Sequence, residues 1–432
     1  MAKMPRCQAS GVSAHVCPSM RMETGGQMID GADTAWLMIS SVLVLMMTLP
    51  ALGLFYAGLV QAKNVLSVLV QCLAIACVVS LAWFVVGYSE AFSGTGPVLG
   101  DLKALLLQNV GRNAVHPGAR VPETVYIMFQ MTFAIITPGL IVGAYVERIR
   151  FGAVILFSLL WLLIVYDPVA HWVWGGGWLA AYGVMDFAGG IVVHVTAGTS
   201  AVVIAAMIGS RDGFPREVRP PHAPWMVMIG GCFLWVGWFG FNAGSAIKSG
   251  ADAGMTMLAT HLAASAATLT WMAIERVKFG KPSVVGAVTG SVAGLATITP
   301  ASGYVGPLGA VVLGFAASCL CFAAVAAVKR KFKIDDALDV LGVHGVGGAF
   351  GSIALPLAAG IGTGGAALSH ATGQQLAVQL LGVVSVAIWS ALATAAIVKF
   401  VALTAGLRVA REAETQGLDF TAHGEVGYHV AG

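Results

Sequence analysis

Charged residues are scarce in this chain. They make up 10% of its 432 residues, whereas soluble domains carry about 25%. This scarcity excludes a well-solvated globular surface. The formal net charge of +3 is also too weak and too dispersed to indicate a nucleic-acid partner.

Motifs of reactive chemistry are missing as well. The seven cysteines form no C-x-x-C pair, and we interpret them as small apolar filler. The sequence contains neither G-x-S-x-G nor H-E-x-x-H, which weighs against an intramembrane hydrolase. We therefore expect no enzyme, no metal and no cofactor.

Apolar residues are abundant instead. They form 58% of the chain, and the mean hydropathy is +0.84. The 55 glycines suit helices that pack closely in a bilayer, because small residues let helix backbones approach one another. These features predict an integral, multi-pass membrane protein of the all-α class.

Apolar segments bounded by charge clusters and turn residues predict eleven transmembrane helices. Each approaches the roughly 20 residues that cross about 30 Å of hydrocarbon. The predicted spans are 36–60, 65–88, 124–146, 151–170, 183–209, 224–247, 255–274, 283–299, 305–328, 338–359 and 374–405.

The distribution of Lys and Arg predicts the orientation. Most of them lie at one set of span ends, for example Arg211 and Lys329. Positive charges favour the cytoplasmic side, so the N-terminus is predicted outside and the C-terminus inside.

The chain divides into three regions by composition. Residues 1–27 lack the apolar core and cleavage site of a signal peptide and are predicted to be a disordered extension. Residues 28–407 form the predicted transmembrane domain. Residues 408–432 form a polar tail, which is either a docked regulatory segment or a solvated one.

Eleven spans can divide into five, five and one, and an odd-numbered repeat must insert with inverted topology. Spans five and ten are then equivalent, and each carries an intramembrane histidine. His194 lies eight residues after Asp186, and His344 lies five residues after Asp339. The two imidazoles approach the midplane from opposite faces and are expected to meet. The alternative is two separate packing histidines.

Other candidate residues have plainer interpretations. His261 has no repeat partner and is expected to be a packing residue. His171 lies at a membrane edge with Trp172, Trp174 and Trp178. Composition favours an interfacial belt there, and the alternative is an aromatic ring that faces the entrance of a cation path.

Ordered motifs run from about residue 30 to the C-terminus. They are G-L-F-Y-A-G-L, M-F-Q-M-T-F, E-R-I-R-F, A-H-W-V-W-G-G-G, D-F-A-G-G-I-V-V-H-V-T-A-G, G-W-F-G-F-N-A-G-S, T-P-A-S-G-Y, D-D-A-L-D-V-L-G-V-H-G-V-G-G and G-L-D-F-T-A-H-G-E. With these motifs the chain closely resembles the ammonium transporter family, which comprises Amt and Mep proteins and the more distant Rhesus proteins.

The resemblance implies a role for each matching position. The outer ammonium site would consist of Phe129, Phe133, Trp174 and Ser245; the gate of Phe133 and Phe241; the pore centre of His194 and His344; and the supporting residues near the outer site would be Asp186 and Thr299. Trp174 and Ser245 favour the Amt branch over the Rhesus branch. For Asp186 we favour a structural role as a backbone cap.

The resemblance further implies a homotrimer in the cell (inner) membrane, with one pore per protomer, that imports ammonium for nitrogen metabolism. A PII-type signalling protein is the partner implied at the cytoplasmic face. We expect ammonium to shed its proton and pass as ammonia, with or without separate proton transfer. The alternatives are a neutral-gas channel of Rhesus type and a membrane ammonium sensor.

Overall fold

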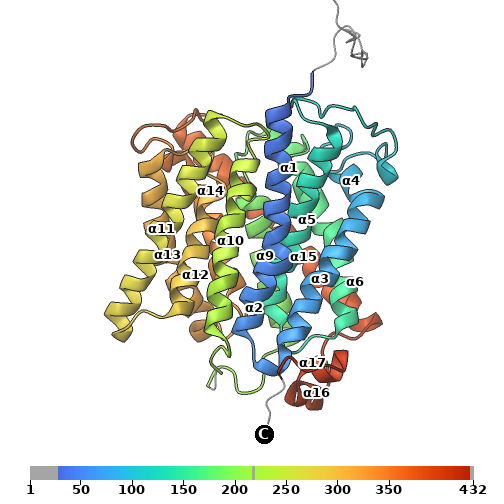
Figure 1. The fold of residues 1–432 in the computed structure, drawn as a ribbon, viewed down its shortest axis with the longest axis vertical. Coiled ribbons are helices and arrows are strands. Elements are labelled where there is room, and N and C mark those ends of the chain that lie inside the picture. Colours follow the sequence, from blue (N-terminus) through green and yellow to red (C-terminus); the bar gives the residue numbers. More distant parts are fainter. Residues whose placement is uncertain (1–27, 217–218, 429–432) are drawn as a thin grey trace, which may run out of the picture.

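The computed structural model describes residues 28–216 and 219–428. Within these ranges the regular structure is helical, and the long helices run side by side as a bundle (Figure 1). The predicted extension 1–27 and the last four residues of the tail lie outside the described residues.

Ten helical segments of the described chain are long and apolar enough to cross a membrane. Several are composite, because short π-helical or 3-10 turns, or a short break, join their parts. They are α1, η1 and α2 (Gly31–Leu59); η2, α3, η3 and α4 (Ala62–Phe92); α5 (Glu123–Tyr145); α6, η5, α7 and α8 (Phe151–Ala181); η6 and α9 (Gly190–Ile208); α10 (Pro224–Gly244); α11 (Ala251–Phe279); α13 and η7 (Pro307–Lys331); η8 and α14 (Leu341–Ala358); and α15 (Thr372–Thr404).

The eighth predicted span, 283–299, corresponds to a shorter helix. Helix α12 (Val284–Ile298) has 15 residues and is preceded by Ser283, whose hydroxyl caps the Gly286 N–H. Eleven of its residues are buried against neighbouring helices. The helix is therefore apolar and enclosed, but shorter than the predicted span.

The fifth predicted span, 183–209, begins too early. Residues 183–189 are not helical, and the helical segment starts at Gly190 in η6 (Gly190–Val195), which continues into α9 (Thr196–Ile208). Gly189 has a φ of 115°, a left-handed conformation that glycine adopts without steric cost and that ends the preceding loop.

The tenth predicted span, 338–359, also begins too early. Its helical segment starts at Leu341 in η8 (Leu341–Gly345) and continues as α14 (Val346–Ala358). Asp339 has a φ of 65° and therefore lies in the loop. Both histidine-bearing segments thus begin as broken helices inside the bundle.

The two broken helices cross where glycines face each other. A Cβ atom on Gly198 of α9 would lie 2.2 Å from the Cα atom of Gly345, which is closer than real side chains come. The backbones can approach only because neither residue has a side chain. This crossing brings the turns that carry His194 and His344 together.

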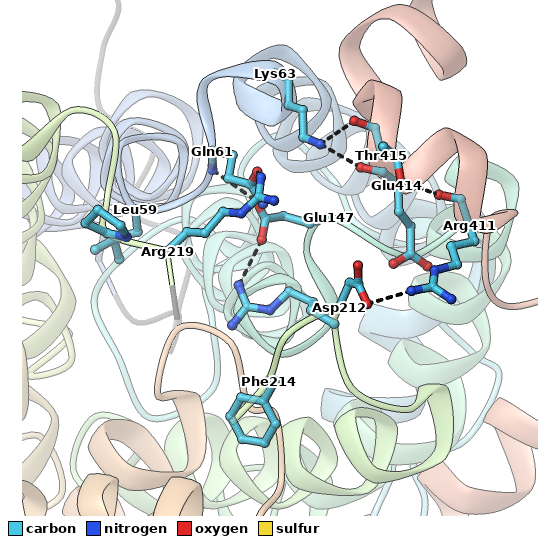
Figure 2. A pocket seen from close by; sticks show the side chains of 12 residues that line it. Leu59, Gln61, Lys63, Glu147, Asp212, Phe214, Arg219, Arg411, Glu414 and Thr415 are labelled. Atoms are coloured by element: carbon cyan, nitrogen blue, oxygen red, sulfur yellow. Dashed lines mark hydrogen bonds and ion pairs between the residues drawn. The ribbon is translucent and has the colours of Figure 1, made fainter. Parts of the chain in front are cut away.

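The described part of the tail packs against one end of the bundle, beneath α3 (Figure 1). Helices α16 (Arg411–Gln416) and α17 (Leu418–His423) form it. Lys63 Nζ donates to the carbonyl oxygens of Glu414 and Thr415, as Figure 2 shows. The ammonium group thereby caps the C-terminal end of α16.

The capping is reciprocal. Asp419 Oδ1 accepts the Ser67 N–H at 2.8 Å, in the first turn of α3 (Val65–Ala82). In return, Asn64 Oδ1 accepts the Leu418 N–H at 2.8 Å. Helix ends leave backbone groups unpaired. Here a side chain of the tail pairs a backbone N–H of the bundle, and a side chain of the bundle pairs a backbone N–H of the tail.

Candidate functional site

Two cavities lie at opposite ends of the bundle, and a narrow passage lies between them. The first, which we call the aromatic cavity, has a volume of about 280 Å³. It is lined by Tyr126, Gln130, Phe133, Val173, Trp174, Val184, Asp186, Phe187, Ser245, Ile247 and Tyr304.

The break between α7 (Asp167–Val173) and α8 (Trp178–Ala181) places Trp174 on the wall of the aromatic cavity. Its indole N–H donates to the carbonyl oxygen of Asp186 at 2.9 Å, which fixes the ring. The ring lies edge-on to Phe133, with 5.8 Å between centroids. Trp174 is therefore held to present an aromatic surface to the cavity.

Phe129 is placed behind this surface. It is buried and packs against Phe133 at 5.0 Å between ring centroids. It is not among the described residues that line the aromatic cavity. Its contact with the predicted substrate site therefore runs through the Phe133 ring.

Two polar groups of the aromatic cavity differ in how they are satisfied. The carboxylate of Asp186 accepts the N–H groups of four consecutive residues, Gly189 to Val192, at 2.7–3.0 Å. These are the bonds of a helix cap, so this carboxylate is committed to the backbone. By contrast, the hydroxyl of Ser245 donates to the Phe241 carbonyl, which leaves oxygen lone pairs to accept a bond.

Two phenylalanine rings separate the aromatic cavity from the passage. Phe133 lines the cavity and Phe241 lines the passage. Their centroids are 4.3 Å apart, and their planes are inclined by 34°. The two rings are therefore in contact between the cavity and the passage.

The passage, which we call the histidine passage, has a volume of about 10 Å³, roughly that of a single water-sized probe. His194 and His344 line it, with Nδ1 atoms 3.3 Å apart. Two facing ring nitrogens at this distance share one hydrogen, so the tautomer of each ring fixes that of the other. The remaining lining is apolar: Met47, Leu52, Phe55, Ile136, Leu140, Val193, Leu234, Trp238 and Phe241.

Thr299 contacts Trp238, which lines the histidine passage, and is not among the described residues that line the aromatic cavity. Its hydroxyl accepts the indole N–H of Trp238 at 2.9 Å and donates to the Leu295 carbonyl. Trp238 in turn stacks against His194, with 5.6 Å between centroids. Thr299 therefore supports the passage through Trp238.

The second cavity, which we call the charged cavity, has a volume of about 180 Å³ and includes His344 in its wall. Its ionisable lining residues besides His344 and Tyr56 are Arg211, Arg219, Lys329 and Asp339. Lys329 pairs with Asp339 at 2.7 Å. Two of its charged groups thus neutralise each other.

A buried ion network lies beside the charged cavity. Arg211 bridges Glu147, at 2.9 Å, and Asp335, at 2.8 Å. Burial acts to raise the pKa of Asp335, but the hydrogen bonds and charge of Arg211 outweigh it and lower the pKa below its ordinary value. Glu147 also accepts from Asn64, the residue that holds the tail. The network therefore connects the tail with the loop before His344.

The next residue in that loop has the opposite tendency. Asp336 is fully buried, and burial together with the charge of Asp339 raises its pKa to about 7. Its Oδ2 accepts the Leu341 N–H at 2.7 Å, at the start of η8. Its Oδ1 has no hydrogen-bond partner among the described residues. A neutral carboxyl suits this setting.

The other histidines lie away from the passage. Both ring nitrogens of His171 lie within hydrogen-bond distance of carbonyl oxygens, those of Ala91 and Gly96, so this residue holds the loop after α4 (Tyr88–Phe92). Trp172 likewise donates to Val98 O. His261 lies on an exposed face of α11, near Trp235. Of His171, Trp172, Trp174 and Trp178, which the sequence placed together at a membrane edge, only Trp174 lines the aromatic cavity.

Sequence reasoning missed part of the cavity lining. Tyr126 lines the aromatic cavity together with Gln130, whose amide donates to the Tyr126 hydroxyl at 3.1 Å. Tyr126, Gln130 and Phe133 have the spacing of one helix face, which is a signal present in the sequence. Tyr304 also lines the cavity and belongs to the quoted T-P-A-S-G-Y motif.

The helices and the row of cavities define a multi-pass membrane protein with a site between its two ends. Residues 35–428 match the model of the Ammonium Transporter Family. An ammonium transporter of Aquifex aeolicus is 42% identical over 405 residues, which cover 93% of this chain and 94% of the relative.

Solved structures agree with this assignment. The crystal structure of Candida albicans Mep2 has a TM-score of 0.82 and 35% identity, and the match covers 89% of this chain and 88% of that one. A structure named Sensor Amt Protein has a TM-score of 0.84 and 28% identity over 91% of this chain and 98% of that one. The chain belongs to the ammonium transporter family, which confirms the resemblance found in the sequence.

Proposed function

We propose that the protein carries ammonium across the membrane by binding it in the aromatic cavity, removing its proton and conducting ammonia through the histidine passage into the charged cavity. The observation that carries this proposal is the order of the parts: aromatic cavity, contacting Phe133 and Phe241 rings, histidine pair, charged cavity. Each part suits one step.

Binding requires discrimination from potassium, a cation of similar size. Trp174 and Phe133 offer aromatic rings, and a desolvated cation–π contact is worth about 2 kcal/mol. The Ser245 hydroxyl can accept an N–H bond, which potassium cannot donate. Directional bonding therefore favours ammonium.

Conduction requires loss of charge. The histidine passage is narrow and mostly apolar, so a bare cation would pay several kcal/mol to enter it. Deprotonation removes most of this cost for ammonium and cannot do so for potassium. The paired imidazoles supply acceptor nitrogens at the point where the cation is least stable.

The assembly and topology belong to the same proposal. We place the aromatic cavity outside and the charged cavity with the tail in the cytoplasm, because Lys and Arg gather at the tail end. Helix α12, the eighth predicted span, brings the number of spans to eleven. The broken helices of His194 and His344 are equivalent members of a five-plus-five inverted repeat. The protein acts as a homotrimer in the cell (inner) membrane.

The docked tail supports a regulatory role for residues 408–432. It contacts Lys63 and Asn64 and lies on the end of the bundle that carries the charged cavity. A pocket lies between the tail and the loop around Asp212 (Figure 2), and its volume is about 180 Å³. A PII-type protein is the partner that we expect on this face.

A transport measurement tests the proposal. Purified protein in proteoliposomes is exposed to ammonium steps, and both current and ammonium uptake are recorded. Saturable uptake that excludes potassium supports a transporter, and the charge per ammonium separates net ammonium transport from ammonia conduction. Uptake without saturation would favour a Rhesus-type channel. Ammonium binding without uptake would favour a sensor, the function by which one similar structure is named.

A further inference from the structure

Gln379 of α15 is a fully buried amide whose hydrogen-bonding capacity is completely used. Its Oε1 accepts the Met185 N–H at 2.8 Å and the Gln375 amide at 3.2 Å. Its Nε2 donates to the carbonyl oxygens of Met185, at 2.7 Å, and Ser352, at 3.0 Å. A side-chain amide has two acceptor and two donor positions, so all four are occupied here.

The segment that Gln379 holds is not part of a helix. Residues 183–189 form the break before η6. Gln375 Nε2 donates to Gly183 O at 2.9 Å. Gln375 and Gln379, one helical turn apart, therefore both hydrogen-bond to the backbone of this break. Gly382 continues this face of α15, and a Cβ there would lie 3.1 Å from Val184. Helix α15 is thus pressed against the break along two turns.

Met185, to which Gln379 hydrogen-bonds, is adjacent in sequence to Asp186, a residue that lines the aromatic cavity. Met185 precedes Asp186, whose carboxylate caps η6 and whose carbonyl oxygen accepts the Trp174 indole N–H at 2.9 Å. A shift of the Met185 backbone therefore moves the acceptor that orients the Trp174 ring. Cation–π attraction depends on the position of the ring face, so such a shift weakens cation binding.

We propose that Gln379 is a positioning residue for the cation site: its amide fixes the Met185–Asp186 backbone and, through the Asp186 carbonyl, the orientation of the Trp174 ring. This inference rests on the proposed role of the aromatic cavity as the ammonium site. It also gives α15, the helix outside the inverted repeat, a task in substrate binding.

The test replaces Gln379 with Met, which has a similar length and makes no comparable hydrogen bonds. Ammonium uptake is measured in proteoliposomes against ammonium concentration. We expect Gln379→Met to raise the half-saturating concentration about five- to tenfold while the maximal rate stays within about twofold of wild type. An unchanged half-saturating concentration would overturn the proposal.

Thr394→Val is the matched control. Thr394 is also a buried polar residue of α15, and its hydroxyl bonds Ser200 and the Trp161 indole, away from the aromatic cavity. We expect its half-saturating concentration to stay within about twofold of wild type, because distant sites act independently. An equal rise in both variants would show a general packing defect and overturn the proposal.

A double variant separates positioning from a merely structural role. If Gln379 acts through the Trp174 ring, Gln379→Met has little left to change once that ring is gone. We expect Gln379→Met added to Trp174→Leu to change the half-saturating concentration by less than about twofold. A full multiplicative effect would overturn the proposal.

A substitute variant and the wild-type uptake separate misfolding, failure of the positioning role and failure of the proposed function. If Gln379→Met does not elute as a monodisperse protein, Gln379→Glu replaces it, because the carboxyl keeps an acceptor for Met185 N–H and loses the amide donors. Wild-type protein without saturable ammonium uptake would refute the proposed function itself. Saturable wild-type uptake with an unaltered Gln379 variant refutes only the positioning role.

Discussion

The two cavities differ most in whether their polar and aromatic groups are already used in contacts within the protein or remain free to contact a ligand. In the aromatic cavity, the Asp186 carboxylate is occupied by backbone N–H groups, while the Trp174 ring face and the Ser245 lone pairs remain open. In the charged cavity, Asp339 is paired with Lys329. We therefore propose the cavity with fewer charges as the cation site, because recognition depends on uncommitted groups and not on the number of charges.

The largest expected effect lies between the cavities, at the histidine pair. His194→Ala or His344→Ala should abolish normal ammonium transport without unfolding the protein, because the surrounding side chains are apolar. His→Asp at either position should admit potassium, since a fixed anion stabilises a cation that cannot lose a proton. Uptake assays with potassium competition check both outcomes. Wild-type uptake and selectivity in both Ala variants would contradict the paired mechanism.

The next largest expected effect is a change in the half-saturating ammonium concentration, which we compare between variants in the two cavities. Trp174→Leu removes one ring face and should cost about 1–2 kcal/mol of cation binding, which raises the half-saturating concentration roughly five- to thirtyfold. Asp339→Asn is the control in the charged cavity, where we expect a change of about twofold or less, because a partly exposed ion pair contributes little. Equal effects in the two cavities would remove the distinction between them.

A smaller effect concerns the tail at the charged end. Asp419→Ala removes the cap of the Ser67 N–H and should weaken tail docking by about 1 kcal/mol. Limited proteolysis of the detergent-solubilised protein measures docking, and cleavage within 408–428 should become faster. Glu425→Ala is the control, because Glu425 is an exposed tail residue. Equal cleavage of Asp419→Ala and wild type would contradict the capping role.

The smallest effect is a pH dependence at the charged end. The folded state raises the pKa of Asp336 to about 7, so it holds this proton more tightly than the unfolded chain does. Stability from this group is present at low pH and is lost as the pH rises through 7, by about 0.7 kcal/mol between pH 6.5 and 7.5. Thermal unfolding of Asp336→Asn, which keeps an acceptor for Leu341, should lack this slope. A slope equal to that of wild type would assign it to another group.

Much of the fold could be predicted from the apolar pattern, but the breaks in its helices could not. Hydropathy continues across residues 183–189, so the sequence predicted a helix where the Asp186 cap and Gly189 produce a loop. A capping role for Asp186 was expected, but a contact between side chain and backbone leaves no periodic trace that locates the start of the helix. Asp339 shifted the start of the tenth span for a similar reason, because its left-handed conformation is decided by the surrounding loop.

The candidate site was predictable to the extent that it uses unusual residue types. Intramembrane histidines are rare and costly, so His194 and His344 could be singled out, and the structure brings them together. The contacts of Thr299 and Phe129 could not be predicted, because they depend on which ring each residue touches. Gln379 gave no signal in sequence, since a single polar residue in an apolar helix has many possible partners.

Helix α12 has a consequence for the surrounding lipid. Its 15 residues rise about 22 Å, less than the roughly 30 Å of a bilayer core, whereas the adjacent α11 has 29 residues and rises about 43 Å. A helix this short would thin the bilayer if lipid chains lay along it. Most of α12 is instead covered by α10, α11, α13 and α14. The hydrophobic thickness that lipids meet on this side is therefore set by the longer neighbours, and α12 is sheltered from mismatch with the membrane.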